Sequence, residues 1–404
     1  MSRVAMVVAP LHGHVNPALG TAAELVRGGH RVTVHLPERF RAAAEGVGAD
    51  LSACADPSPP PWAATDDPLE RFAGVPAVLA DAARSVVPDV LEALAADPPD
   101  VLAYDQLSVA GRLVADRAPG RVVQLCTTYV AGPAWSPWRT PEFAAVPRLA
   151  AAGQAWAAAV AELAERFGTP RLEVADLLAG TDRPTVVFVP RVLHPAAATY
   201  GERFTFAGPA LRPPMPGDAA ELAALDLPAD GPVVYVSMGT LFGDVNGLDE
   251  VCVAAFDATP WDVVLALPGA TAGRRGAVRI RRSVPQLGVL RRSTIAVTHG
   301  GMGSVLEALA ADVPLVVVPR VPEQEITANR LVALGAAVRL DPADLSPPRL
   351  RDAVDRVAAD ATIRRAVDRL GHAVRSSGGA AAAAAAIIRP GGGASGVTRS
   401  PEAP

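Results

Sequence analysis

Two histidines close to the N-terminus have a side chain and a position that suit proton transfer. His12 and His14 lie in the segment LHGHVNP, directly after a short apolar run typical of a buried strand. An imidazole titrates near neutrality, so either residue can remove a proton from a hydroxyl group. A surface or hydrogen-bonded loop histidine is the alternative. A metal site is less favoured, because no Cys or Glu ligand set accompanies the pair.

A single carboxylate, Asp105, ends another apolar strand pattern, in VLAYDQLS. At that position it can cap the helix that follows. It can also hold the imidazole of His14 in one tautomer and stabilise its charged form, as the third member of a catalytic triad does. The spacing leaves both interpretations open.

The segment THGGMGSVLEAL is typical of a turn that binds an anion. A strand ends at Thr298, glycines allow the backbone to approach a ligand, and a helix is predicted to begin near Gly303 or Ser304. The free N–H groups and the positive dipole end of that helix suit a phosphate. His299 can add a donor, and Ser304 can cap the helix. The turn matches neither the GxGxxG fingerprint nor a Walker loop, so an ordinary strand-to-helix turn is the alternative.

Polar and aromatic side chains provide two further candidates. Glu323 and Gln324 follow a strand pattern in VPRVPEQEITANRL, where they can bind sugar hydroxyls or simply form the polar start of a helix. A local enrichment of aromatic residues either lines an apolar acceptor pocket or packs in the core. Its members are Tyr129, Trp135, Trp138, Phe143 and Trp156.

The elements that must position these residues repeat one pattern in both halves of the chain. Strand, turn, helix and strand follow each other in RVAMVVAP, LHGHVN, PALGTAAELVRGG and RVTVHLP, with Pro17 in the first helical turn. The pattern starts again at PVVYVSMGT. Such units build parallel sheets, and ligands bind beyond the carboxyl ends of their strands. We therefore expect two α/β sheets whose loops after Pro10, Met238 and Thr298 face one cleft.

Composition sets the domain boundaries and excludes several classes of protein. The 404 residues, half of them hydrophobic, are enough for two domains. We predict an N-terminal domain over residues 1–210, a Pro- and Gly-rich linker over 211–232, a C-terminal domain over 233–389 and a disordered tail over 390–404. The net charge of −5 argues against nucleic acid or an anionic membrane as partner.

Cysteine usage and hydropathy indicate the compartment. Cys54, Cys126 and Cys252 are widely spaced and odd in number, which favours buried thiols over disulfides or a zinc cluster. No apolar run reaches the roughly 18–20 residues that cross a bilayer, and no targeting signal is recognisable. We expect a cytoplasmic protein without an integral membrane segment.

Taken together, the motifs resemble the family 1 natural-product glycosyltransferases of bacteria, which decorate macrolides, enediynes and other polyketides. GHVNP, SMGT, SVPQLGVL, THGGMGSVLEALAADVPLVVVP and EQ with TANR occur in that order over nearly the whole chain. The resemblance implies an α/β GT-B fold, in which two Rossmann-like domains face a central cleft. It implies inverting transfer from a dTDP- or UDP-linked sugar to a hydroxyl of a lipophilic natural product, with no cofactor and no metal.

The resemblance also assigns residues. His14 matches the general base and Asp105 the carboxylate that orients it, with His12 as a minor candidate for the base. As acceptor-binding residues we predict His12 and, from the aromatic enrichment rather than the resemblance, Tyr129, Trp135 and Trp138. The donor-binding positions are Ser237, Gly239 and Thr240 at the phosphates, Val284 and Gln286 at the nucleoside, His299, Gly300, Gly301, Gly303 and Ser304 at the diphosphate, and Glu323 and Gln324 at the sugar.

Two departures from the family pattern concern the donor. Ser283 stands where many relatives have a Trp that stacks on the base, and Glu323 stands where many have Asp. Both are compatible with a thymidine diphosphate deoxysugar. The alternatives are a sugar-nucleotide epimerase or hydrolase of the same fold, and a non-catalytic helper of a partner glycosyltransferase. We expect a monomer or a homodimer.

Overall fold

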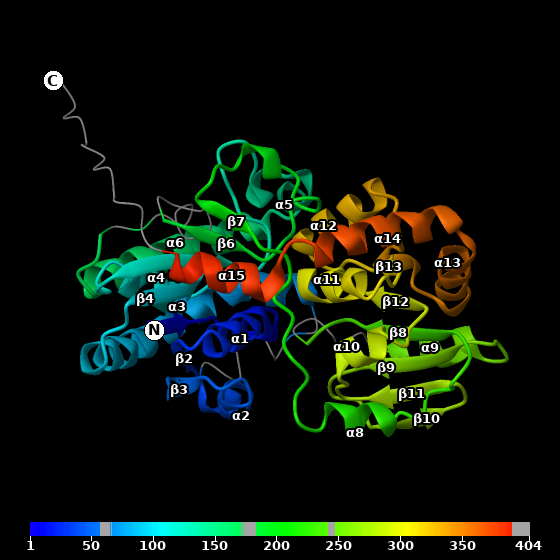
Figure 1. The fold of residues 1–404 in the computed structure, drawn as a ribbon. Helices are drawn as coiled ribbons and strands as arrows, with labels where there is room; N and C mark the ends of the chain where they lie inside the picture. The colour runs from blue at the N-terminus through cyan, green and yellow to red at the C-terminus, as the bar shows by residue number, and fades with distance from the viewer. Residues whose placement is uncertain (57–64, 66, 171, 173–182, 241–246, 390–404) are drawn as a thin grey trace.

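The computed structural model describes residues 1–389 apart from 57–64, 66, 171, 173–182 and 241–246. The tail predicted over 390–404 lies outside the described residues. Two sheets, one from each half of the chain, lie side by side with helices around them (Figure 1).

The N-terminal sheet has seven parallel strands in the order β3-β2-β1-β4-β5-β6-β7. They are β1 (Arg3–Val7), β2 (Arg31–Leu36), β3 (Asp50–Ala53), β4 (Val101–Asp105), β5 (Arg121–Cys126), β6 (Thr185–Val187) and β7 (Phe204–Phe206). This is the doubly wound order, whose direction reverses between β1 and β4. A ligand crevice is expected beyond the carboxyl ends of those two strands.

Helices cover both faces of this sheet because successive strand residues point to opposite faces and both sets are apolar. Val4 and Met6 of β1 pack with α1 (His12–Arg27), α2 (Arg41–Glu45) and α15 (Gly379–Ile388). Ala5 and Val7 pack with α3 (Pro68–Ala96), α4 (Val109–Ala115) and α6 (Arg148–Arg166).

The C-terminal sheet repeats this topology, with the order β10-β11-β9-β8-β12-β13-β14. Its strands are β8 (Val233–Ser237), β9 (Asp262–Ala266), β10 (Gly273–Arg275), β11 (Val278–Arg281), β12 (Ile295–Thr298), β13 (Leu315–Val317) and β14 (Ala337–Arg339). Strand β10 is an antiparallel addition at the edge, and the other pairs are parallel. The order from β11 to β14 is again doubly wound, so the second crevice lies between β8 and β12.

Shorter helices surround the C-terminal sheet and the junction. They are α8 (Asp218–Ala223), α9 (Leu248–Phe256), α10 (Gln286–Leu290), α11 (Met302–Ala310), α12 (Pro322–Ala333), α13 (Pro347–Ala359) and α14 (Ala361–Arg375). The N-terminal half adds α5 (Pro141–Ala144), which packs against α12. The two halves therefore touch beyond the cleft as well as across it.

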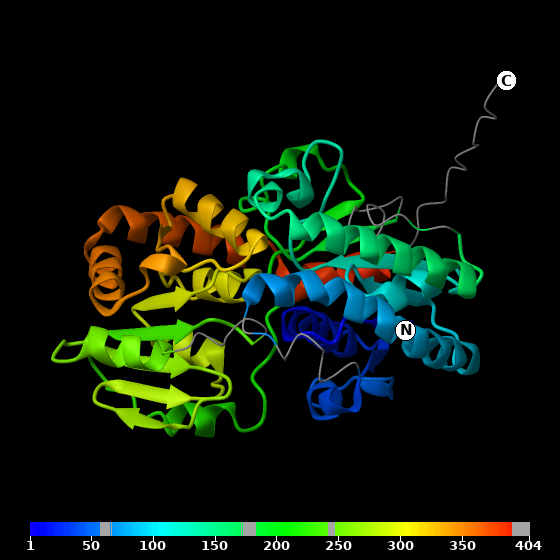
Figure 2. The ribbon, with the colours of Figure 1, turned by 180° about the vertical axis from the view of Figure 1, so that it is seen from behind.

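The last helix returns to the first half of the molecule. The Ala-rich run forms the predicted helix, α15, which lies beside α1 on the N-terminal sheet (Figures 1 and 2). Ala383 and Ile387 are fully buried there, and small alanine side chains allow the helices to approach closely. The range 233–389 predicted for the C-terminal domain thus includes a helix that belongs to the other core.

Helix α1 begins earlier than predicted. The segment expected as a loop is its first turn, which starts at His12, and Pro17 lies inside the helix. The carbonyl of Leu11 accepts the N–H groups of both His14 (2.8 Å) and Val15 (2.9 Å), which closes the first turn. Proline lacks only the single N–H that would bond four residues back, and its fixed φ suits a helix near its start. Both histidines are therefore held on regular backbone.

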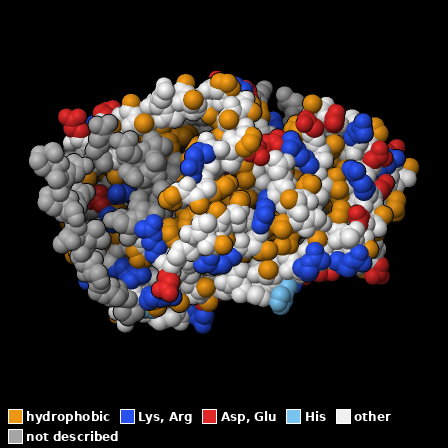
Figure 3. Space-filling model, turned by 90° about the horizontal axis from the view of Figure 1, so that it is seen from above, with side chains coloured by type: hydrophobic (Ala, Val, Ile, Leu, Met, Phe, Trp, Pro, Cys, Tyr) orange, Lys and Arg blue, Asp and Glu red, His pale blue; other side chains and the backbone are white. Residues whose placement is uncertain are grey.

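Arg side chains are interspersed with Asp and Glu on the described part of the face seen in Figure 3. Of the free cysteines, Cys126 and Cys252 are buried as expected, whereas Cys54 is half-buried. None of the described helices has the length and apolarity needed to cross a membrane.

Candidate functional site

A cleft of about 970 Å³ lies between the two sheets and receives the carboxyl ends of strands from both. From the N-terminal sheet it is lined by the first turn of α1 and by Thr127 and Thr128 after β5. From the C-terminal sheet it is lined by Ser237 at the end of β8, by the turn after β12 and by the start of α12. Its volume is at the upper end of the range for small-molecule sites, which is about 300–1,000 Å³.

His14 and Asp105 form a hydrogen-bonded pair at the N-terminal side of the cleft. The Nδ1 atom of His14 lies 2.8 Å from Oδ2 of Asp105, and the other carboxylate oxygen accepts the N–H of Leu107 at 2.8 Å. Ser108, not Asp105, caps helix α4 through its hydroxyl. Asp105 is only 1% exposed, whereas the His14 side chain is 13% exposed and lines the cleft. Nε2 of His14 is thus the ring nitrogen left for a ligand.

The surroundings of His14 favour its charged form. Burial alone would lower the pKa of the imidazole, but the attraction and hydrogen bond of Asp105 and the negative charge of Glu323 outweigh it. The pKa therefore lies above its ordinary value of 6.5. The hydroxyl of Thr127 lies 2.9 Å from Nδ1 and adds a second contact to the ring.

His12 lies in the same helical turn but has different neighbours. Its exposed ring packs edge-on against Phe40, with 5.5 Å between the ring centroids. Burial and the positive charges of Arg39 and Arg212 lower its pKa. It lines the cleft, but it is His14 that is paired with a carboxylate.

On the opposite side, the Gly-rich turn leads into the N-terminus of α11. Gly300 has a φ of +88°, a conformation that residues other than glycine rarely adopt. Gly301, not Ser304, is the N-cap, so the helix begins one or two residues before the predicted start. The first N–H groups of an α-helix have no partner within it, so they are available to an anion in the cleft.

His299 is enclosed between two glycines. A Cβ atom on Gly239 would lie 2.6 Å from its Cε1 atom, and one on Gly301 would lie 2.5 Å from its Nε2 atom, so neither position has room for a side chain. Burial, helped by the charge of Arg320, lowers the pKa of His299 to about 4. At neutral pH this imidazole is uncharged, and it can offer an N–H donor but no positive charge.

A polar network lies at the end of the cleft formed by α10. The amide of Gln286 accepts a hydrogen bond from Tyr235 (2.8 Å) and donates to Glu307 (2.7 Å) and Ser304 (3.3 Å). Burial raises the pKa of Glu307, partly offset by Gln286 and Arg212. Glu307 also lines the cleft, which places one more carboxylate beside Gln286.

A hydrogen bond crosses the cleft near the start of α12. The hydroxyl of Thr128, from the N-terminal half, donates to Glu323, from the C-terminal half, at 2.6 Å. The side chain of the next residue, Gln324, accepts the N–H of Arg320 at 2.9 Å and is buried. Glu323 thus lies between the two halves, close enough to affect the pKa of His14.

The structure brings nearly all the residues predicted from the sequence to one cleft. The predicted residues that line it are His12, His14, Ser237, Gly239, Thr240, Val284, Gln286, His299, Gly301, Gly303, Ser304, Glu323 and Gln324. Asp105 lies behind His14. Gly300 shapes the turn, where an added Cβ atom would lie 2.8 Å from Cγ1 of Val317 and 3.2 Å from the carbonyl oxygen of Gln324.

The three aromatic residues predicted to contact the acceptor lie outside the lining of this cleft. Among the described residues that line the cleft, none of the three is present. Tyr129 is buried and contacts Thr327 of α12, and Trp135 packs edge-on against it with centroids 5.5 Å apart. Trp138 is 44% exposed and packs on Phe143. These rings stabilise the loop after β5, which packs on α12, so they fill a contact between the halves.

Several residues that line the cleft were not predicted from the sequence, among them Glu307, Thr127 and Thr128. Glu307 follows Ser304 by three positions, so helical periodicity places both on one face of α11. Thr127 and Thr128 directly follow β5, at the edge where ligands bind in such sheets. Helical periodicity could have identified Glu307, and the position of Thr127 and Thr128 directly after a strand could have identified the two hydroxyl groups.

Comparisons with known proteins connect this geometry to a family. Residues 239–393 match the family described as "Erythromycin biosynthesis protein CIII-like, C-terminal domain". The chain is 30% identical to the NDP-glycosyltransferase YjiC of Bacillus subtilis, over 93% of this chain and 94% of that protein. It is 32% identical to the demethyllactenocin mycarosyltransferase of Streptomyces fradiae, over 94% and 84% of the two chains.

A solved structure supports the same relation. The glycosyltransferase of kitacinnamycin superposes with a TM-score of 0.79 at 33% identity, over 96% of this chain and 98% of that one. The expected fold class, two Rossmann-like domains around a central cleft, is thereby confirmed.

Proposed function

We propose a function on the basis of the family to which the chain belongs, the natural-product glycosyltransferases of the GT-B fold, which use nucleotide-diphosphate sugars. The chain transfers a sugar from a dTDP- or UDP-linked donor to a hydroxyl of a lipophilic natural product. The configuration at the anomeric carbon is inverted. One observation carries the proposal. His14, which is paired with Asp105, and the N-terminus of α11 line a single cleft from opposite sheets.

His14 is the proposed general base. Its Nε2 atom takes the proton of the acceptor hydroxyl as the hydroxyl oxygen attacks the anomeric carbon, and the bond from that carbon to the diphosphate oxygen breaks on the opposite side. Displacement from the opposite face inverts the configuration. Asp105 holds the other nitrogen, Nδ1, as the protonated one and stabilises the imidazolium that forms. A positioned base of this kind typically contributes about 10²–10⁴-fold.

The leaving diphosphate is the proposed ligand of the α11 N-terminus. Its charge grows as the sugar departs, and the amides of the first turn are already oriented toward it. The helix dipole contributes about 0.3–1 kcal/mol at an exposed end and up to about 2 kcal/mol when partly buried. His299 adds a neutral donor, since its pKa of about 4 keeps it uncharged.

The remaining polar side chains fit the two ends of the donor. Gln286 and Glu307, at the α10 end, suit the hydroxyls of the nucleoside ribose. Glu323 and Gln324, near His14, suit the hydroxyls of the transferred sugar. The named function of the mycarosyltransferase relative supports a natural product as the acceptor.

A donor-by-acceptor panel tests the proposal. UDP-glucose and dTDP-glucose, both α-linked, are incubated with macrolide and aromatic polyketide aglycones, and products are detected by mass spectrometry. The linkage is then assigned by NMR, and a β-glycoside is expected. An α-glycoside would reject inversion.

The same panel separates the two alternatives. A transferase consumes little donor in the absence of acceptor, whereas a hydrolase or epimerase consumes or isomerises it at an undiminished rate. A non-catalytic helper gives no product with any donor and forms a stable complex with a partner enzyme.

A further inference from the structure

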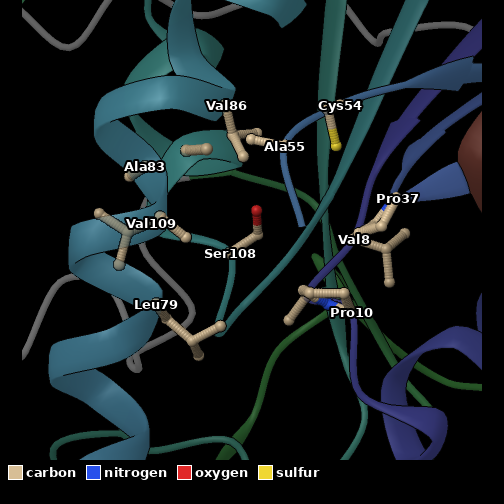
Figure 4. Close-up of a pocket in the computed structure, with 13 residues that line it drawn as sticks. Val8, Pro10, Pro37, Cys54, Ala55, Leu79, Ala83, Val86, Ser108 and Val109 are labelled. Atoms are coloured by element: carbon tan, nitrogen blue, oxygen red, sulfur yellow. The ribbon is translucent and has the colours of Figure 1, made fainter. Parts of the chain in front are cut away.

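A second, smaller cavity adjoins the cleft on its N-terminal side. It lies between helix α3, the segment after β1, the start of α4 and the segment after β3, and its volume is about 30 Å³ (Figure 4). Pro10 and Leu79 border both this cavity, called the side chamber below, and the cleft. The side chamber is therefore a direct neighbour of the cleft that His14 lines.

The walls of the side chamber are almost entirely apolar. Leu79, Ala83 and Val86 of α3 face Val8, directly after β1, across it (Figure 4). The hydroxyl oxygen of Ser108, which is also in the wall, accepts the N–H of Gly111 at 3.0 Å and so caps α4.

The thiol in the wall is uncharged as well. Burial raises the pKa of Cys54 to about 12, so the sulfur remains protonated at neutral pH. With no charged side chain in its wall, the chamber suits an uncharged apolar group.

Size limits the occupant. A cavity needs about 10–15 Å³ of this kind of volume to hold one water molecule, so the side chamber has room for about two water-sized groups. Water also needs two to four polar partners, and the side chains of this wall offer only the Ser108 hydroxyl and the Cys54 thiol. One or two carbon atoms fit both the volume and the chemistry.

The chamber is also close in sequence to the proposed catalytic pair. Pro10 precedes His14 by four residues, and Ser108 follows Asp105 by three. The shared residues Pro10 and Leu79 therefore place the chamber beside the part of the cleft that His14 lines.

We propose that the side chamber receives a short alkyl branch, methyl to ethyl in size, that lies next to the attacked hydroxyl of the acceptor. This inference rests on the proposed function, and it narrows the acceptor class. Ala83 and Val86 then limit the length of the branch, because they are part of the wall contributed by α3.

Equilibrium binding tests the proposal without relying on turnover. The probes are 2-naphthol and its 3-methyl, 3-ethyl, 3-propyl and 3-butyl derivatives, titrated by naphthol fluorescence into enzyme saturated with UDP. Each carbon that enters an apolar space is worth about fourfold in Kd, so affinity is expected to rise to the ethyl derivative. It should then fall for propyl and butyl.

Three variants locate the effect. Ala83→Leu fills the chamber and should abolish the gain from methyl and ethyl. Ala77→Leu adds the same atoms to the exposed side of the same helix and should retain the gain. Val86→Ala enlarges the chamber and should move the optimum from ethyl to propyl, which decides the question even if Ala83→Leu does not fold.

The outcomes separate this inference from the proposed function. Three results would overturn the proposal for the side chamber. They are an affinity that does not depend on alkyl chain length, a chain-length dependence that is unchanged in both chamber variants, and no binding of any alkyl naphthol. Glucosyl transfer from UDP-glucose to the same naphthols is measured in parallel. Transfer with a flat binding series rejects the chamber alone, and a chain-length optimum without transfer to any acceptor rejects the function alone.

Discussion

The two sheet edges that border the cleft, called the mouths of the sheets below, share one architecture and differ in their chemistry. Each lies at the switch point of a doubly wound order, β1 and β4 in one half and β8 and β12 in the other. Each places a histidine at the cleft. His14 is paired with a buried carboxylate, whereas His299 is enclosed by the backbone at Gly239 and Gly301.

These surroundings move the two imidazoles in opposite directions. Negative charges raise the pKa of His14 despite its burial, whereas burial lowers the pKa of His299 to about 4. The fold brings a histidine to each crevice, but the side chains beside it decide whether it can exchange a proton or only donate a hydrogen bond. Function in this molecule therefore depends on local residues placed on a repeated scaffold.

The substitution His14→Ala should have the largest effect on activity, and this effect should be confined to the N-terminal half of the cleft. Loss of the base should lower kcat by about 10²–10⁴-fold, because proton removal from the acceptor then depends on water. The affinity for UDP or dTDP, measured by calorimetry, should remain near the wild-type value, because the proposed site of that ligand lies in the other half.

His12→Ala is the matched control for this variant, since it removes an imidazole from the same helical turn. Its loss of kcat should be much smaller. Activity of His14→Ala close to that of the wild type would remove the base assignment, and equal losses in both variants would point to damage of α1 rather than to proton transfer.

Asp105→Asn should have the next largest effect on activity, because it changes the tautomer of His14. One side-chain oxygen already accepts the N–H of Leu107. The asparagine oxygen would keep that bond, and its NH₂ group would face Nδ1 of His14. Nδ1 would then accept a hydrogen bond, which leaves the proton on Nε2, the atom needed as the base. We expect a loss in kcat/KM of about 10²-fold or more.

The pH profile provides a second measurement for the same variant. In the wild type, kcat/KM should fall as pH drops through a pKa above 6.5, because protonated His14 cannot act as a base. Without the charge of Asp105 the pKa falls, so the acidic limb of the residual activity should move to lower pH. An unmoved limb would show that another group titrates.

Gly301→Ala affects the other half, with a smaller effect. The new Cβ would lie 2.5 Å from Nε2 of His299, so the turn or the ring must move. Overpacking of this kind typically costs about 1–3 kcal/mol, and we expect a roughly tenfold weaker affinity for UDP. The acidic limb of kcat/KM should stay in place, because His14 is untouched.

Gly153→Ala is its control, since a Cβ at that position in α6 meets nothing within 4 Å. It should raise thermal stability slightly, by helix propensity, and leave the affinity for UDP unchanged. Wild-type affinity in Gly301→Ala would mean that the diphosphate does not bind beside His299.

Part of this contrast was predictable from the sequence. Strand patterns and glycines indicated the two sheets and both mouths, because period and turn chemistry are local properties. The pairing of His14 with Asp105 remained one of two interpretations, because it depends on a contact between residues 91 positions apart. The directions of the two pKa shifts were not predictable, since they arise from burial and from charges brought together by the fold.

The misplaced elements have the same physical origin. Pro17 suggested a helix start, but the carbonyl of Leu11 closes a turn before it. The aromatic residues Trp135 and Trp138 suggested a pocket, but nothing local in the sequence distinguishes a ring that lines a cleft from one that packs a loop. Helix α15 lies in the chain after the C-terminal sheet and packs on the other one, which only long-range contact decides.

The smallest expected effect is on the pH dependence of stability, and it involves a third histidine, His35. Burial lowers the pKa of His35 to about 4, as for His299, so both bind fewer protons in the folded protein than in the unfolded chain between about pH 4 and 6.5. The stability they contribute is present above pH 6.5 and is lost as pH falls toward 4. His14 has the opposite sign, because its raised pKa favours the folded state below 6.5 and the gain is lost as pH rises through the folded value.

Denaturant unfolding of wild type and His35→Leu, measured from pH 7 to pH 4, checks this sign. Each buried neutral histidine can contribute a slope of up to about 1.4 kcal/mol per pH unit in that window. Removal of His35, whose Nδ1 has no hydrogen-bond partner among the described residues, should reduce the slope by up to that amount while activity at neutral pH is retained. An unchanged slope would mean that burial does not keep His35 neutral. The comparison between a raised and a lowered imidazole pKa would then hold only for His14 and His299.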